Sequence, residues 1–171
     1  MSAAPIIVTA LFGAADFAKL DGLRRQHYPP ERNQVPAHLT LFAHLPPSLE
    51  QELGRRLAAV TTAAPPRARL AGVIDLGSGT ALRVESEGLE ALRDDLADAF
   101  HGLLAMQDSG PWHPHVTIQN KVEPREARTL QLRLRASFAP EPLTIAGLAS
   151  WRYLGGPWQA IRRYPFRGGR V

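Results

Sequence analysis

The 171-residue chain contains no cysteine, only two lysines and no long uninterrupted apolar run. Without cysteine, the chain cannot form a disulfide, a thiolate nucleophile or a cysteine-ligated metal site. A membrane-spanning helix needs about 18 or more consecutive apolar residues, which no segment supplies. The apolar segment 1–17 has no preceding Lys or Arg and is interrupted by Pro5 and Thr9, so we do not interpret it as a signal peptide. We therefore expect a cytoplasmic protein that makes no membrane contact.

Arginine supplies 18 of the 20 basic residues, and the formal net charge is +4. A guanidinium group binds phosphate through two parallel hydrogen bonds, so a polyanionic partner such as RNA is a reasonable expectation. An excess of Arg over Lys also arises from genomic base composition alone, and net charge says little about function. The basic C-terminal segment 162–171 is compatible with RNA contact or with a solvated tail.

Hydrophobic periodicity predicts alternating strands and helices in a chain short enough to form a single domain, residues 1–171. Short β-branched or alternating runs indicate strands, whereas apolar residues that recur every three or four positions indicate helices. The expected strands lie within 5–12, 37–44, 64–77, 78–86 and 113–120, with two more within 142–166, and the expected helices at 13–28, 46–62, 87–105 and 123–137.

The expected elements occur twice in the same order. Strand, helix, strand, helix and strand follow one another at about 5–76 and again at about 80–153, before a C-terminal strand at about 157–166. The segment LAGV at 70–73 is echoed 75 residues later by IAGL, and the pattern His-x-Thr at His38 is echoed 77 residues later at His115. Two similar offsets predict a duplicated β-α-β-α-β unit and a two-lobed, pseudo-twofold domain rather than a solenoid.

Both His-x-Thr patterns lie in expected strands, where side chains alternate between two faces. Six His and eight Thr predict only about 0.3 accidental matches of this pattern in the chain. Aliphatic side chains occupy one face of each strand, and the other face therefore points into a cleft if the lobes pack about a pseudo-twofold axis. The cleft faces are expected to carry His38, Thr40, Phe42 and His44 on the first strand and His113, His115, Thr117 and Gln119 on the second.

Two imidazoles and two hydroxyls suit displacement at phosphorus. With an ordinary pKa near 6.5, one His can accept a proton from the attacking oxygen while the other donates one to the departing oxygen. A hydroxyl two residues along the strand lies about 7 Å away on the same face. There it can donate a hydrogen bond to a non-bridging phosphate oxygen.

The segments HLTLF at 38–42 and HVTIQ at 115–119, in a chain of this length, resemble the 2H phosphoesterase superfamily. More narrowly, the chain is similar to the bacterial RNA 2′,3′-cyclic phosphodiesterases, also called 2′-5′ RNA ligases, from Ile6 to Phe166. The resemblance implies an α+β bilobal fold in which two antiparallel sheets line a central cleft and the helices lie outside.

The same resemblance implies that His38 and His115 are catalytic and that Thr40 and Thr117 bind phosphate. It implies chemistry without a metal or another cofactor. Many relatives follow the second motif with a small residue and then Arg, whereas this chain has Gln119 and Asn120. The residue that supplies positive charge to the substrate is therefore not evident from the sequence.

We expect a monomeric phosphoesterase that acts on 2′,3′-cyclic phosphates or 2′-5′ bonds of RNA ends or nucleotides. Ligation is the reverse of such a transfer. For opening of a cyclic phosphate, we expect His115 to be the base and His38 the acid. One alternative is a nonenzymatic RNA-binding module that retains the same cleft. Another is a metal hydrolase built on His113 and His115, although a zinc site needs three or four ligands.

Further residues are candidates for substrate contact. His44 and His113 continue the cleft face, but a His at a strand end is commonly just partly solvated. The aromatic residues Trp112, Trp151 and Tyr153 are able to stack on bases, and they are equally suited to a hydrophobic core. His27 and His101 lie on expected helices, where we expect them to be ordinary surface residues.

Overall fold

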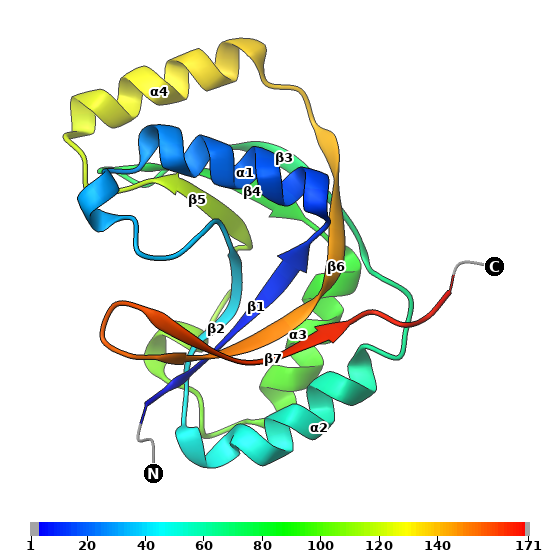
Figure 1. Ribbon diagram of the computed structural model, residues 1–171. Coiled ribbons are helices and arrows are strands. Elements are labelled where there is room, and N and C mark those ends of the chain that lie inside the picture. The colour runs from blue at the N-terminus through cyan, green and yellow to red at the C-terminus, as the bar shows by residue number, and fades with distance from the viewer. Residues whose placement is uncertain (1–3, 170–171) are drawn as a thin grey trace.

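The computed structural model describes residues 4–169 and confirms an α+β fold (Figure 1). The last two residues of the basic C-terminal segment, Arg170 and Val171, lie outside the described residues. The strands are β1 (Ile6–Phe12), β2 (Leu39–Leu45), β3 (Arg67–Asp75), β4 (Thr80–Glu85), β5 (His115–Gln119), β6 (Glu141–Tyr153) and β7 (Trp158–Pro165). The helices are α1 (Ala14–His27), α2 (Glu50–Val60), α3 (Glu87–Ala99) and α4 (Pro124–Ser137).

All strand pairs are antiparallel, in the order β2-β1-β6-β3-β4-β5, with β7 paired to β6. Strand β6 connects two wings, because residues 141–144 pair with β3 and residues 145–152 pair with β1. We call the set β1, β2, β7 and the later part of β6 the His38 wing. We call the set β3, β4, β5 and the early part of β6 the His115 wing. The two expected sheets are therefore continuous through one long strand.

The strand register reproduces both offsets seen in the sequence. A row of directly paired residues crosses the three corresponding strands of each wing. The rows are Thr40–Thr9–Ala149 in the His38 wing and Thr117–Ala81–Ile74 in the His115 wing. The outer members of the rows are 77 and 75 residues apart in the sequence, as the repeated motifs are. This agreement supports our proposal that the chain consists of two halves at about 5–76 and 80–153.

Each wing combines strands and helices from both halves of the chain. Figure 1 shows α1 and α4 beside β3, β4 and β5, with α2 and α3 at the other end beside β1, β2 and β7. Arg24 on α1 donates to the carbonyl oxygen of Thr117 in β5, at 3.0 Å. In the same way, Arg93 on α3 donates to the carbonyl oxygen of Leu41 in β2, also at 3.0 Å. Each motif strand is thus held by a buried arginine from a helix of the other half.

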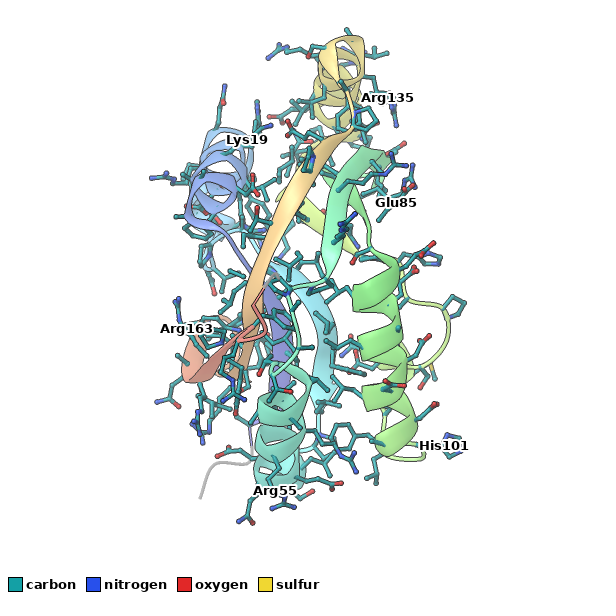
Figure 2. The ribbon with its side chains drawn as sticks, turned by 90° about the vertical axis from the view of Figure 1, so that its right-hand side faces the viewer. Lys19, Arg55, Glu85, His101, Arg135 and Arg163 are labelled. Atoms are coloured by element: carbon teal, nitrogen blue, oxygen red, sulfur yellow. The ribbon has the colours of Figure 1, made fainter. Side chains whose placement is uncertain are left out.

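The hydrophobic core lies where one stripe of each helix meets the sheet. Leu20 of α1, Leu57 of α2 and Leu89 of α3 are fully buried, as are Ile6 and Val8 of β1. Burial of one such side chain contributes about 1.5–3 kcal/mol to folding. Charged side chains extend from the outer surfaces, as Lys19, Arg55 and Arg135 do in Figure 2.

The helix expected at 87–105 is shorter than predicted. Helix α3 ends at Ala99, and Gly102 then adopts a φ of 82°, a left-handed conformation that glycine tolerates and that ends helices. The periodic apolar residues Leu89, Leu92 and Leu96 all precede this turn, so the pattern located the helix but not its end. Within residues 4–169, no helix is both long enough and apolar enough to cross a membrane.

Candidate active site

His38 and His115 have the same local geometry. The Nδ1 atom of His38 lies 2.9 Å from the carbonyl oxygen of Pro36, and that of His115 lies 2.7 Å from the carbonyl oxygen of His113. A carbonyl can only accept, so Nδ1 is the protonated nitrogen in each neutral ring. The hydrogen bond to the residue two positions earlier therefore fixes the tautomer and leaves Nε2 free for proton transfer in both rings.

The fold brings the two motifs together. Strands β2 and β5 contact each other although they belong to different wings. The indole Nε1 of Trp112, just before the second motif, donates to the carbonyl oxygen of Thr40 at 3.0 Å. His115 lies close enough to His38 that its charge contributes to lowering the pKa of His38. The structure therefore places both imidazoles in one electrostatic environment.

The hydroxyl groups of Thr40 and Thr117 are free to bind a ligand. Both side chains are half-buried, and neither hydroxyl makes a hydrogen bond within residues 4–169. The backbone carbonyls of the same two residues are engaged by Trp112 and Arg24, which fixes the strands without using the hydroxyls. Two fixed hydroxyls beside two imidazoles can donate hydrogen bonds to the non-bridging oxygens of a phosphate.

The surroundings of the two histidines differ. The indole of Trp158 lies over His38, with ring centroids 4.6 Å apart and planes tilted by 60°. Burial of the imidazole lowers the pKa of His38 to about 4; the Pro36 carbonyl opposes this shift, whereas Arg24 and His115 add to it. The side chain of His115 is exposed. His38 is therefore neutral over the whole physiological pH range.

An apolar cavity of about 550 Å³ opens beside His38. One aromatic wall is Trp151, whose Nε1 donates to the hydroxyl of Thr9 at 2.9 Å. Trp158 lies 6.0 Å from Trp151, between ring centroids, and Arg163 of β7 also lines the cavity. The walls include no carboxylate among the described residues. The cavity is suited to a flat apolar group attached to an anion held at His38.

Phe42 and Gln119, predicted to face the cleft, are buried instead. In each motif strand the register slips by one residue directly after the Thr, at Leu41 in β2 and at Ile118 in β5. Such a bulge turns the following side chain toward the interior. Phe42 accordingly packs under the guanidinium of Arg93, 4.4 Å from its ring centroid, and Gln119 accepts a hydrogen bond from the Thr80 hydroxyl at 2.8 Å. The prediction that they contact substrate was wrong for both.

Three other predicted contact residues are exposed. His44 lines a separate hollow with Met106 and Gln107, away from the cavity beside His38, so its placement on the same face was wrong. Its strand contains a second register slip between Phe42 and Leu45, which breaks the alternation. The side chains of His113 and Tyr153 are exposed but do not line the cavity, and contact between them and a substrate stays a prediction.

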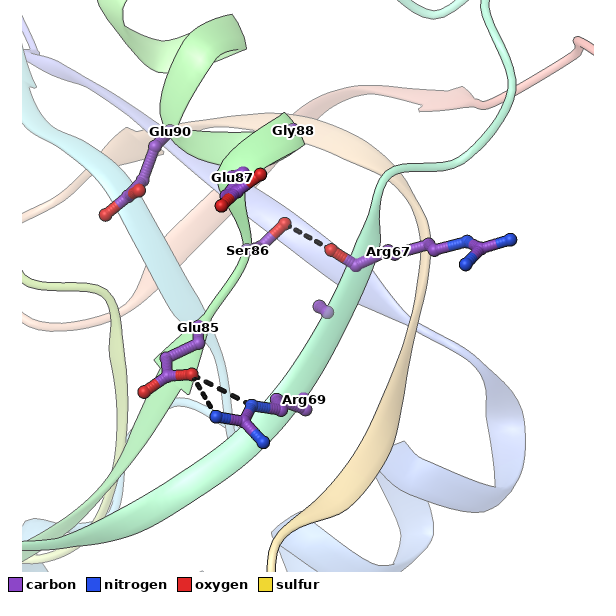
Figure 3. Close-up of a pocket in the computed structure, with 8 residues that line it drawn as sticks. Arg67, Arg69, Glu85, Ser86, Glu87, Gly88 and Glu90 are labelled. Atoms are coloured by element: carbon purple, nitrogen blue, oxygen red, sulfur yellow. Dashed lines mark hydrogen bonds and ion pairs between the residues drawn. The ribbon is translucent and has the colours of Figure 1, made fainter.

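A second hollow, of about 580 Å³, lies at the start of α3 and is lined by charged side chains (Figure 3). Arg69 donates two hydrogen bonds to one carboxylate oxygen of Glu85, at 2.8 and 2.6 Å. The Ser86 hydroxyl donates to the carbonyl oxygen of Arg67 at 2.6 Å and also caps the helix. Because its arginines face several carboxylates and no histidine, this hollow is not suited to phosphate transfer.

The residues that could hold a metal were also considered. Within residues 4–169, no three His, Asp or Glu side chains are grouped closely enough to hold an ion. In the His113–His115 pair, Nδ1 of His115 already donates to the carbonyl oxygen of His113. A metal bound to this pair would therefore have only Nε2 of His115 to use, unless that hydrogen bond breaks.

Sequence reasoning missed Thr9, Trp158 and Arg163. Thr9 lies in an apolar strand and gains its role only through pairing with β2 and β6. Trp158 follows a Gly-Gly-Pro turn, a signal that places it next to the tip of a hairpin. Nothing in the sequence shows that this hairpin folds over His38.

Comparisons with known proteins agree with this geometry. The sequence model of the 2′-5′ RNA ligase superfamily matches residues 13–157. A search of curated proteins found no match. Among solved structures, TT0787 of Thermus thermophilus is similar with a TM-score of 0.68 and 19% identity, over 97% of this chain and 100% of that one. LigT of E. coli, solved with 3′-AMP, gives 0.60 and 19%, over 95% of this chain and 98% of LigT. At these identities the likeness to solved structures shows the fold.

Proposed function

Because this chain belongs to the 2′-5′ RNA ligase superfamily, we propose that it is a phosphoesterase acting on 2′,3′-cyclic phosphates or 2′-5′ bonds of RNA ends or nucleotides. The observation that carries the proposal is the matched pair of His38 and His115. Each ring is anchored through Nδ1 to the carbonyl two residues before it and presents Nε2. Two anchored imidazoles and two unengaged threonine hydroxyls are the groups that acid–base displacement at phosphorus requires.

The reaction on a cyclic phosphate needs one proton accepted and one proton donated. Nε2 of one imidazole takes the proton from water as the water oxygen forms a bond to phosphorus. The bond from phosphorus to one ribose oxygen breaks, and Nε2–H of the other imidazole protonates that oxygen. Thr40 and Thr117 donate hydrogen bonds to the non-bridging oxygens. When a ribose hydroxyl replaces water, the same steps in reverse form a 2′-5′ bond.

We assign His38 as the base in ring opening, the reverse of the assignment made from the sequence. The base must start neutral, and burial under Trp158 lowers the pKa of His38 to about 4. The acid must start protonated, and an anionic substrate beside the exposed His115 favours its imidazolium form. The difference between the two histidines thus comes from their surroundings rather than from their anchors.

Hydrolysis of a substrate panel tests the proposal. The panel consists of the four 2′,3′-cyclic nucleotides, a 2′-5′ dinucleotide, an RNA with a cyclic phosphate end and ADP-ribose cyclic phosphate. We expect turnover of at least one of them by the native chain and almost none by His38→Ala or His115→Ala. A folded His38→Ala protein that retains the native rate would contradict the proposal. A protein that is inert on the whole panel but binds RNA would instead support a nonenzymatic module.

A further inference from the structure

The cavity beside His38 is built to take a flat aromatic group. Trp151 is held in place by its hydrogen bond to Thr9, and Trp158 forms a second aromatic wall that also covers His38. A nucleotide whose phosphate lies at His38 and Thr40 carries such a group, its base, on the same ribose. Stacking of a base on an aromatic side chain is worth about 1–3 kcal/mol and does not by itself select one base.

Arg163 lies at the far end of the cavity from Thr40. One row of paired residues crosses four strands of the His38 wing, from Thr40 through Thr9 and Ala149 to Arg163. Three strand spacings separate the Cα atoms of Thr40 and Arg163 by about 14 Å. An extended arginine side chain spans only part of that distance. Its guanidinium therefore reaches a group attached to the phosphate rather than lying on the phosphate itself.

The guanidinium of Arg163 is available for a ligand. It makes no ion pair or hydrogen bond within residues 4–169, and its side chain is exposed along the cavity wall. Arg24, the other cation near His38, is buried and already donates to Asn33 and to the Thr117 carbonyl. Arg162, next in the chain, lies instead against the ring of Tyr164, 5.3 Å from its centroid.

We propose that this cavity binds the base of the substrate nucleotide and that Arg163 makes guanine the preferred base. The inference rests on the proposed function. Guanine presents two adjacent acceptors, O6 and N7, which match the fork of an arginine. Adenine places an amino donor beside N7, so it opposes the same fork. The pyrimidines are shorter and offer no such pair of acceptors to a guanidinium one base away from the phosphate.

The test is to measure kcat/KM for the four 2′,3′-cyclic nucleotides and, by calorimetry, the Kd of the four nucleoside 3′-monophosphates. We expect guanine to be preferred over adenine by about 10-fold in both measurements, as one bidentate pair allows. Arg163→Gln should reduce this preference to less than about 2-fold and leave the values for the other bases nearly unchanged. Arg163→Lys keeps the charge without the fork, and it should also lose most of the preference.

Arg162→Gln is the matched control, because it removes a neighbouring cation that faces Tyr164, and it should retain the native preference. Equal values for guanine and adenine in the native protein would overturn the inference. So would an equal loss for all four bases in Arg163→Gln, or a gain conferred on every base by a 5′-phosphate and lost in that variant. If no cyclic nucleotide is hydrolysed, the proposed function fails, whereas calorimetry with the 3′-monophosphates still decides the base preference.

Discussion

The His38 wing and the His115 wing carry the same motif in the same register, but only one of them has an additional strand. In both, a His is anchored two residues back, a Thr follows it, and a bulge follows the Thr. Strand β7 pairs with β6 in the His38 wing and adds Trp158 and Arg163 beside the motif. Duplication accounts for the paired groups, and the strand outside the repeat makes the two members of the pair different.

This difference has a chemical meaning. Two identical imidazoles would share one pKa, and the fraction of molecules with one neutral and one protonated ring would be limited by that single value. Burial of His38 under an indole lowers one pKa and leaves the other ring in solvent. An asymmetric environment therefore assigns the roles of base and acid to two residues that the repeat makes equivalent.

The largest expected effect comes from removing either histidine. His38→Ala and His115→Ala should each reduce kcat/KM by at least about 10³-fold, because loss of either proton transfer stops the displacement. The double variant should be little worse than either single one, since residues that act as a unit are not additive. Steady-state kinetics on the best substrate, with circular dichroism to verify folding, measure this.

His27→Ala and His101→Ala are the controls for the histidine variants. His27 lies at the end of α1 and His101 lies exposed beyond α3, as Figure 2 shows. Neither lines the cavity beside His38, so both variants should turn over substrate at nearly the native rate. Additive losses in the double His38 and His115 variant would argue that the two rings act independently.

Removal of one hydroxyl should have the next largest effect. Thr40→Val and Thr117→Val keep the shape of the side chain but remove a donor, and each should reduce kcat by about 10²–10³-fold. Equal losses would indicate that both wings contact the phosphate. A loss confined to one variant would show that the phosphate is bound by a single wing. Thr62→Val is a control, because that hydroxyl bonds only to the carbonyl of Ala59 at the end of α2.

A change at Trp158 should move the pH dependence rather than abolish activity. Burial penalises the charged form of His38, so the acid limb of kcat/KM should lie near pH 4 in the native protein. Trp158→Ala exposes the imidazole, which should shift this limb upward toward about pH 6.5. Leu154→Ala alters an exposed residue of the same hairpin and should leave the limb in place. A native limb already near the ordinary histidine pKa of about 6.5 would contradict the assignment of His38 as base.

Treatment with EDTA should have the smallest effect, which is none. The proposed transfer uses two imidazoles and two hydroxyls, and neither wing needs an ion for these steps. The measurement is kcat before and after exhaustive chelation, followed by addition of Zn²⁺ or Mn²⁺. Loss of activity that either ion restores would favour a metal hydrolase built on the His113–His115 side and would break the equivalence of the wings.

Periodicity predicted the strands and helices well, and the repeat predicted the pseudo-twofold arrangement. The paired His-x-Thr pattern also predicted which four side chains meet, because a shared face and a repeated topology follow from local pattern. The positions of Phe42 and Gln119 were wrong, since a bulge depends on how a strand pairs with its neighbour and leaves no local signature. The same holds for Trp158 and Arg163, whose proximity to His38 is created by pairing between β6 and β7.

The path of β6 has a consequence for folding. Strand β3, from the first half, pairs only with β4 and β6, both from the second half, and α1 packs against β5. A fragment that ends near Asp75 would leave β3 without a partner and Arg24 without its acceptor at Thr117. Most of the stabilising pairs thus join residues far apart in sequence, such as Thr9 and Trp151. Chains of this kind fold slowly and lose their structure in one cooperative step, so neither half is expected to persist alone after cleavage between them.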